Sequence, residues 1–130
     1  MSTPADFDER YRRVGEPAMV RAERSVLGAD YGAISYTTRA QADRLARLLE
    51  LAPGRLLLDI GSGAGWPGIY LAASTGCRVV LTDVPREGLL VAKQRMADDG
   101  VEGGALVASG TALPLRDGSF DAVTNSDVFC

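Results

Sequence analysis

An apolar run that leads into a glycine-rich turn constrains this chain more than any other feature. Residues 56–60 have the composition of a buried strand, with Asp59 close to its end, and glycines occupy positions 61, 63 and 65. Because glycine lacks a Cβ, this backbone can adopt positive φ and approach a ligand closely. A helical pattern follows over residues 66–74, and we expect its free N–H groups to face the same ligand. Strand, glycine turn and helix together predict the opening unit of a nucleotide-type cofactor site in a parallel sheet.

The composition excludes several classes of protein. The 130 residues are 46% hydrophobic and 24% charged, which is ordinary for a globular domain. Histidine is absent, and Cys77 and Cys130 have neither a disulfide framework nor a metal-binding spacing, so we expect no metal site. A formal net charge of −3 argues against a nucleic-acid partner, because phosphate contacts need a basic surface. The sequence has no secretory leader and no apolar run of membrane-spanning length, so we expect a cytoplasmic protein without membrane contact.

The first fifty residues carry helical signals and no strand signal. Pro17 suits the first position of a helix that ends at Gly28, and Thr38 with Gln41 has the form of a capping box. An apolar stripe at helical spacing follows the capping box. We interpret the interleaved charges ahead of this helix as a solvated helical surface: Asp6, Asp8, Glu9, Arg10, Arg12, Arg13, Glu16, Arg21, Glu23 and Arg24.

From residue 55 onward the pattern alternates between strand and helix. Strands are predicted over residues 55–60, 77–82, 105–108 and 120–128, with a helix over residues 85–97 between the second and the third. This alternation is typical of right-handed βαβ crossovers, so we predict an α/β fold with a doubly wound, mostly parallel sheet. The fourth strand would begin the second half of such a sheet, so we expect a fragment or truncated product that lacks this half. Its uncovered edge favours self-association with another chain.

Polar residues follow the predicted strands at the edge where open parallel sheets bind ligands. Asp59 and the glycine turn end the first strand, and Asp83 ends the second. A carboxylate in the position of Asp83 can accept hydrogen bonds from both hydroxyls of a ribose. Residues after the third strand and late in the fourth complete this edge: Ser109, Gly110, Asn125 and Ser126.

Three ordered motifs resemble those of the class I S-adenosylmethionine-dependent methyltransferases. They are Asp59-Ile-Gly61-Ser-Gly63-Ala-Gly65, Thr82-Asp83 and Ala112-Leu-Pro-Leu-Arg-Asp-Gly-Ser-Phe-Asp-Ala-Val123. The likeness is greatest to the branch that acts on small molecules. It implies a Rossmann-like sheet with N-terminal helices, S-adenosyl-L-methionine as cofactor and a small-molecule methyl acceptor. It also divides the chain into an N-terminal helical lid region, residues 1–37, and a partial cofactor-binding domain, residues 38–130.

The resemblance implies a role for each residue at the edge, but no catalytic residue. Tyr31, Tyr36 and the helix from Thr38 are similar to the family's lid. Ser109 replaces the acid that usually pairs with the adenine amino group, so we expect a modest loss of affinity, because neutral acceptors bind more weakly than charged ones. The resemblance implies that Asp59 contacts the cofactor's amino group and that Asp83 binds the ribose. Ser109 and Gly110 would lie beside the adenine, and Asn125 and Ser126 under the sulfonium. The residues implied along the methionine part are Gly61, Ser62, Gly63 and Ala64.

Two other functions remain open at this stage. The segment Gly63-Ala-Gly65-Trp-Pro-Gly68 spells the G-x-G-x-x-G of nicotinamide-dependent oxidoreductases, although it begins too far past the strand and no tyrosine–lysine pair follows. The second alternative is a non-catalytic remnant that binds the cofactor without turnover. At single positions, Asp83 could instead cap the helix that starts at Pro85, and Trp66 could contact a substrate, although packing at the helix start is favoured.

Overall fold

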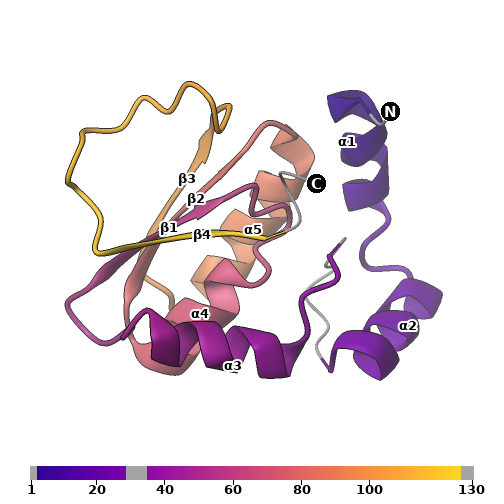
Figure 1. Cartoon of the computed structure of the whole chain (residues 1–130). Coiled ribbons are helices and arrows are strands. Elements are labelled where there is room, and N and C mark those ends of the chain that lie inside the picture. Colours follow the sequence, from indigo (N-terminus) through magenta and orange to yellow (C-terminus); the bar gives the residue numbers. More distant parts are fainter. Residues whose placement is uncertain (1–2, 29–34, 127–130) are drawn as a thin grey trace.

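The computed structural model describes residues 3–28 and 35–126 and has the predicted α/β class (Figure 1). Its elements are α1 (Pro4–Arg12), α2 (Pro17–Leu27), α3 (Arg39–Leu48), β1 (Leu56–Ile60), α4 (Gly68–Thr75), β2 (Arg78–Asp83), α5 (Arg86–Asp98), β3 (Gly103–Val107) and β4 (Ala122–Asn125). Within the two described ranges, no helix combines the length and the apolar character needed to cross a membrane.

The four strands form one parallel sheet in the order β3-β2-β1-β4. The chain moves outward from β1 to β3 and then returns past β1 to β4, so the winding direction reverses between β1 and β4. Open α/β sheets bind ligands at the carboxyl ends of the strands beside such a reversal. The Rossmann-like parallel sheet is therefore confirmed. In the described part of the chain β4 pairs only with β1 and Val123 is 52% exposed, so self-association through this edge stays a prediction.

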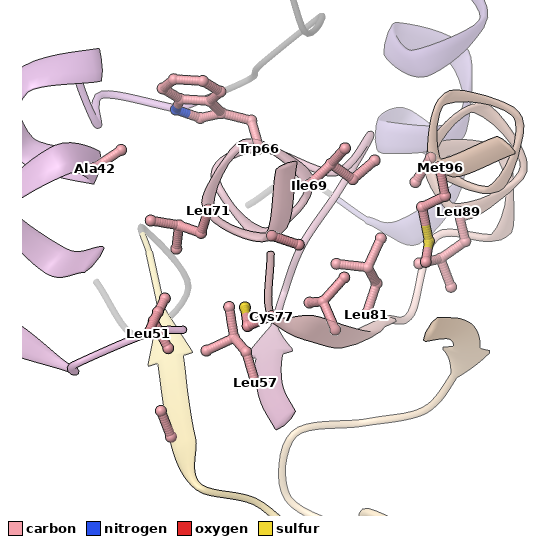
Figure 2. Close-up of a cluster of buried hydrophobic side chains, with 14 residues drawn as sticks. Ala42, Leu51, Leu57, Trp66, Ile69, Leu71, Cys77, Leu81, Leu89 and Met96 are labelled. Carbon is pink, nitrogen blue, oxygen red and sulfur yellow. The ribbon is translucent and has the colours of Figure 1, made fainter. Parts of the chain in front are cut away.

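One apolar core joins the sheet to its helices. The helix α4 lies against β1 and β2, α5 lies against β2 and β3, and α3 packs on α4. Figure 2 shows Leu57 and Leu81 of the strands together with Ile69 and Leu71 of α4, and all four side chains are fully buried. The apolar run of β1 is buried at its centre, whereas Leu56 and Ile60 at its ends are partly exposed.

Two of the predicted helix boundaries follow from local sequence signals. The helix α2 begins at Pro17 and ends before Gly28, which adopts a left-handed conformation with φ of +72°. In the capping box of α3, the Gln41 side chain accepts a hydrogen bond from the Thr38 N–H (2.8 Å), and the Thr38 hydroxyl accepts one from the Gln41 N–H (3.2 Å). Both predictions are confirmed.

The start of α4 differs from the prediction in a way that matters for the site. The helix begins at Gly68, two residues later than expected. Its first N–H groups are used inside the protein, because the Gly68 N–H donates to Asp59 Oδ2 (3.1 Å) and the Ile69 N–H donates to the Gly65 carbonyl (2.8 Å). The expectation that these groups face a ligand is therefore wrong.

Other differences concern strands and one charged side chain. The strand β3 begins at Gly103, two residues earlier than predicted, and β4 begins at Ala122, two residues later; predicted strand residues past 126 lie outside the described chain. The first two residues of β3 were not predicted because both are glycines, which carry no side-chain signal for a strand. Glu23 is buried and does not belong to a solvated surface, since it lies one turn before the buried Leu27 on the same helix face.

Candidate functional site

The glycine turn connects β1 to α4 at the carboxyl end of the sheet. The N–H groups of Gly61 and Ser62 both donate to the Thr82 carbonyl, at 2.7 and 3.0 Å, and fasten the turn to β2. Gly61, Gly63 and Gly65 have φ of +72°, +54° and +102°, and residues other than glycine rarely adopt positive φ of this kind. The sequence therefore needs glycine here for the backbone path itself.

Asp83, at the end of β2, is bonded directly to this turn. Its Oδ2 accepts a hydrogen bond from the Gly63 N–H (2.8 Å) and its Oδ1 accepts one from the Val84 N–H (2.8 Å). Burial raises the pKa of Asp83, while the two backbone hydrogen bonds act to lower it. Because an ionised carboxylate has about four acceptor positions, Asp83 retains capacity for further donors.

The alternative role of Asp83 as a helix cap is wrong. The N-cap of α5 is Pro85, and no side chain of its own segment caps the helix. The Glu87 N–H, in the first turn of α5, instead donates to Asp8 Oδ1 of α1 (3.0 Å). The cap of α5 therefore comes from a helix far away in the sequence.

Asp59 lies beneath the turn. Only 1% of its surface is exposed, and its carboxylate accepts hydrogen bonds from Thr124 Oγ1 (3.0 Å) and from the Gly68 N–H (3.1 Å). Burial raises the pKa of Asp59 to about 7, against the effect of the two hydrogen bonds. The carboxylate thus joins β1, α4 and β4 and is not open to a ligand, in contrast to the contact that the resemblance implied.

A small crevice lies over the turn, and its free volume is about 20 Å³. Its lining combines predicted residues with others that the sequence did not single out for binding: Tyr11, Ser35, Gly61, Ser62, Gly63, Ala64, Trp66 and Ser126. The structure therefore brings the glycine turn and the end of β4 together. Asn125, the last residue of β4, is exposed and is not part of this lining.

The predicted adenine-side residues lie at the neighbouring strand end, outside the crevice. Ser109 and Gly110 follow β3 and are exposed. The Ala108 N–H donates to the Asp83 carbonyl (3.0 Å), which sets Ser109 next to the end of β2. The Ser109 hydroxyl is hydrogen-bonded to Thr111 Oγ1 (2.9 Å). These residues therefore border Asp83 and do not line the crevice over the glycine turn.

Trp66 holds the segment before α3 against the site. It is 4% exposed, and its indole N–H donates to the Thr37 carbonyl (2.8 Å), so the packing interpretation of Trp66 is confirmed. The Thr37 hydroxyl is hydrogen-bonded to the Ser126 hydroxyl at the end of β4. Of the two tyrosines assigned to the lid, Tyr36 is 88% exposed and Tyr31 lies outside the described residues.

Tyr11 of α1 is a site residue that the sequence analysis did not identify. Its side chain is 6% exposed, and a Cβ built on Gly63 would lie 2.3 Å from the Tyr11 hydroxyl oxygen. Burial raises the pKa of Tyr11, and the nearby charge of Asp83 adds to this effect. Its position in a charged helix gave no signal, because only the packing of α1 on α5 brings it to the turn.

The comparisons with known proteins assign the family. A family model described as a methyltransferase domain matches residues 58–130, more than half of the chain, so this chain belongs to that family. The resemblance to the class I S-adenosylmethionine-dependent methyltransferases is confirmed, and the nicotinamide-dependent alternative is wrong.

Individual relatives agree with this assignment. The chain is 43% identical over 86 residues to a demethylmenaquinone methyltransferase of Clavibacter sepedonicus. This match covers 64% of this chain and 34% of the relative. It is 32% identical over 95 residues to 24-methylenesterol C-methyltransferase 2 of Oryza sativa subsp. japonica. This match covers 72% of this chain and 26% of the relative. The chain thus spans about a third or less of the length of these two relatives.

A solved structure shares the fold. The SAM-dependent methyltransferase of Thiobacillus denitrificans, in complex with S-adenosyl-L-homocysteine, superposes with a TM-score of 0.61 at 22% identity. The match covers 70% of this chain and 37% of that one.

Proposed function

We propose that the whole protein transfers a methyl group from S-adenosyl-L-methionine to a small-molecule acceptor. The observation that carries the proposal is the bare glycine turn, hydrogen-bonded to Asp83, beside the reversal of a parallel sheet. Family membership supports the reaction class. The two relatives named above are described as acting on demethylmenaquinone and a methylenesterol, which are small molecules, and the solved neighbour holds S-adenosyl-L-homocysteine, the demethylated cofactor.

The residues present fit this cofactor. Gly61 and Gly63 offer main chain without Cβ atoms for its methionine part, flanked by Ser62 and Ala64. Asp83 retains acceptor capacity for the two ribose hydroxyls, which are hydrogen-bond donors.

The remaining positions would complete the contacts around the cofactor. Ser109 and Gly110, next to Asp83 at the end of β3, would lie beside the adenine. Backbone near Asn125 and Ser126 would lie under the sulfonium. Asp59 would act as a positioning residue from below, because its carboxylate connects the turn's helix to β4.

The protein's contribution to this reaction is mainly alignment. When bound, the cofactor supplies an electrophilic methyl group on its sulfonium. The chain's own residues would hold the methyl donor in line with the acceptor and keep water away. Alignment of this kind can lower a barrier by roughly 7–11 kcal/mol in favourable cases.

Calorimetric titration of the full chain tests the proposal. S-adenosyl-L-methionine and S-adenosyl-L-homocysteine should give saturable heat, and NAD should give none. Asp83→Ala should weaken binding by up to about a hundredfold, since loss of the charge-assisted hydrogen bonds should cost roughly 1.5–3 kcal/mol in total. The matched control is Asp117→Ala, which removes an exposed carboxylate from the loop before β4 and should leave the affinity unchanged.

Three outcomes would contradict the proposal or a part of it. Saturable binding of NAD alone would exclude the methyl donor. An unchanged affinity in a folded Asp83→Ala variant would mean that Asp83 serves only to hold the glycine turn. Cofactor binding without turnover by the whole protein would favour the non-catalytic alternative.

A further inference from the structure

Tyr11 occupies the space directly over the proposed cofactor turn. Its hydroxyl oxygen lies 2.3 Å from the position that a Cβ on Gly63 would take, and the crevice that Tyr11 lines over the turn has a free volume of about 20 Å³. Clefts that hold drug-sized ligands measure roughly 300–1,000 Å³. Among the described residues, the Tyr11 side chain therefore covers the main chain at Gly63, where the proposed cofactor would approach the turn.

The contacts of α1 with the rest of the molecule are made mainly with α5. Tyr11, Val14 and Ala64 form an apolar cluster with Phe7 and Val91, and we call this group the α1 cluster. It is separate from the main core of the molecule. Figure 1 shows α1 beside α5, with the sheet on the far side of α5.

Two polar contacts fasten α1 to the start of α5. Asp8 accepts a hydrogen bond from the Glu87 N–H, and Arg12 pairs with the Glu87 carboxylate at 3.6 Å. The Arg12 and Glu87 side chains are 61% and 31% exposed, and exposed ion pairs contribute little to stability. The ion pair therefore adds little to the hold of α1, which depends mainly on the buried α1 cluster and on the hydrogen bond of Asp8.

The start of α5 is also shaped to receive Tyr11. A Cβ built on Gly88 would lie 3.0 Å from the Tyr11 ring and 3.0 Å from the Gly63 carbonyl carbon. Glycine lowers helix stability at this position but allows the ring to lie between α5 and the turn. The closed position of α1 is thus a fitted contact between specific residues.

We propose that α1 is an internal occupant of the cofactor site, in which the Tyr11 side chain and the cofactor exclude each other above Gly63. This inference rests on the proposed function. Cofactor binding then requires α1 to leave the turn, and the measured affinity equals the intrinsic affinity reduced by the fraction of molecules in which α1 is away. Residues that hold α1 in place therefore set the affinity without contacting the bound cofactor.

Titration of S-adenosyl-L-homocysteine into full-length variants tests this competition. Tyr11→Ala should bind about tenfold more tightly than the wild type, and Arg12→Gln about two- to threefold, because both increase the open fraction. Tyr11→Phe retains the ring and should stay within about twofold of the wild type. The matched control is Arg13→Gln, which removes an ion pair with Glu16 that does not reach α5 and should leave the affinity unchanged.

Hydrogen exchange provides a readout that does not depend on the variants. Saturating S-adenosyl-L-homocysteine should speed the exchange of amides in residues 4–12 of the wild type, because α1 loses its contacts with α5. Slower exchange there, or weaker binding by Tyr11→Ala, would overturn the inference and make Tyr11 a cofactor-contacting residue.

Equal affinity in wild type and Tyr11→Ala would overturn the inference alone. Absence of binding in every variant, Tyr11→Ala included, would overturn the proposed function as well.

Discussion

The main core and the α1 cluster are both apolar, but they are held in different ways. In the main core, side chains from the sheet and from α3, α4 and α5 enclose one another, and Leu57, Ile69 and Leu81 have no exposed surface. The α1 cluster has a few apolar members at the carboxyl end of the sheet, and polar contacts to Glu87 supplement it. The first region fixes the fold, whereas the second holds a single helix over the glycine turn.

Truncation of a core side chain should have the largest effect on stability. Leu81→Ala removes a side chain that is fully buried between the sheet and its helices, so it should lower the free energy of unfolding by about 2–5 kcal/mol in denaturant titrations. The control Leu90→Ala, at a position of α5 that is 44% exposed, should stay within about 0.5 kcal/mol of the wild type. Equal losses in both variants would contradict the distinction between core and surface.

The buried Asp59 should make stability depend on pH. Its pKa is raised from 3.8 to about 7 in the folded protein, so the native state binds this proton more tightly than the unfolded state does. Protonation of Asp59 therefore stabilises the native state fully below about pH 4, and this stabilisation is lost as the pH rises toward 7. Its size is on the order of a few kcal/mol, since one pKa unit corresponds to about 1.4 kcal/mol.

Two variants isolate the contribution of Asp59. In Asp59→Asn the fall in the free energy of unfolding between pH 4 and 7 should be reduced. In Thr124→Val the loss of a hydrogen bond that favours the charged form should raise the Asp59 pKa further, so the fall should extend to higher pH. A pH profile that is the same in all three proteins would exclude Asp59 as its source.

The contact between Gly63 and Tyr11 should be measurable as a clash. Gly63→Ala introduces a side chain at φ of +54° and 2.3 Å from the Tyr11 hydroxyl, so it should cost about 1–3 kcal/mol in stability. Gly100→Ala is the matched control, because Gly100 also has positive φ, +65°, but no atom lies within 4 Å of its Cβ position. The difference between the two variants reports the contact with α1.

Adding Tyr11→Ala to Gly63→Ala sharpens this measurement. The double variant should recover the part of the loss that comes from the clash, with a coupling energy of about 0.5–3 kcal/mol. Strict additivity in unfolding experiments would show that α1 does not lie over the turn.

The sequence predicted those structural features that are determined by residues close to one another in the chain. Proline and glycine marked the ends of α2, and the capping box marked the start of α3. The glycine turn and Asp83 were found because each directly follows an apolar strand. Their mutual hydrogen bond was not foreseen, although both lie at the same edge of the sheet.

Contacts between distant segments could not be read in this way. Asp8 caps a helix 79 positions later in the chain, and nothing in its local pattern indicates that partner. The close packing of Gly88 explains why a residue unfavourable for helices is present in α5. The burial of Tyr11 and Asp59 likewise results from tertiary packing, and their shifted pKa values follow from it.

Trp66 connects the two regions, because it belongs to the main core and also lines the crevice. Trp66→Phe keeps an aromatic ring but removes the indole N–H that donates to the buried Thr37 carbonyl, so it should cost about 0.5–1.5 kcal/mol in unfolding experiments. If the two regions are independent, exchange of amides in residues 35–38 should become faster while exchange in α1 stays the same. Faster exchange in α1 as well would show that the hold on Tyr11 extends through Trp66 into the core.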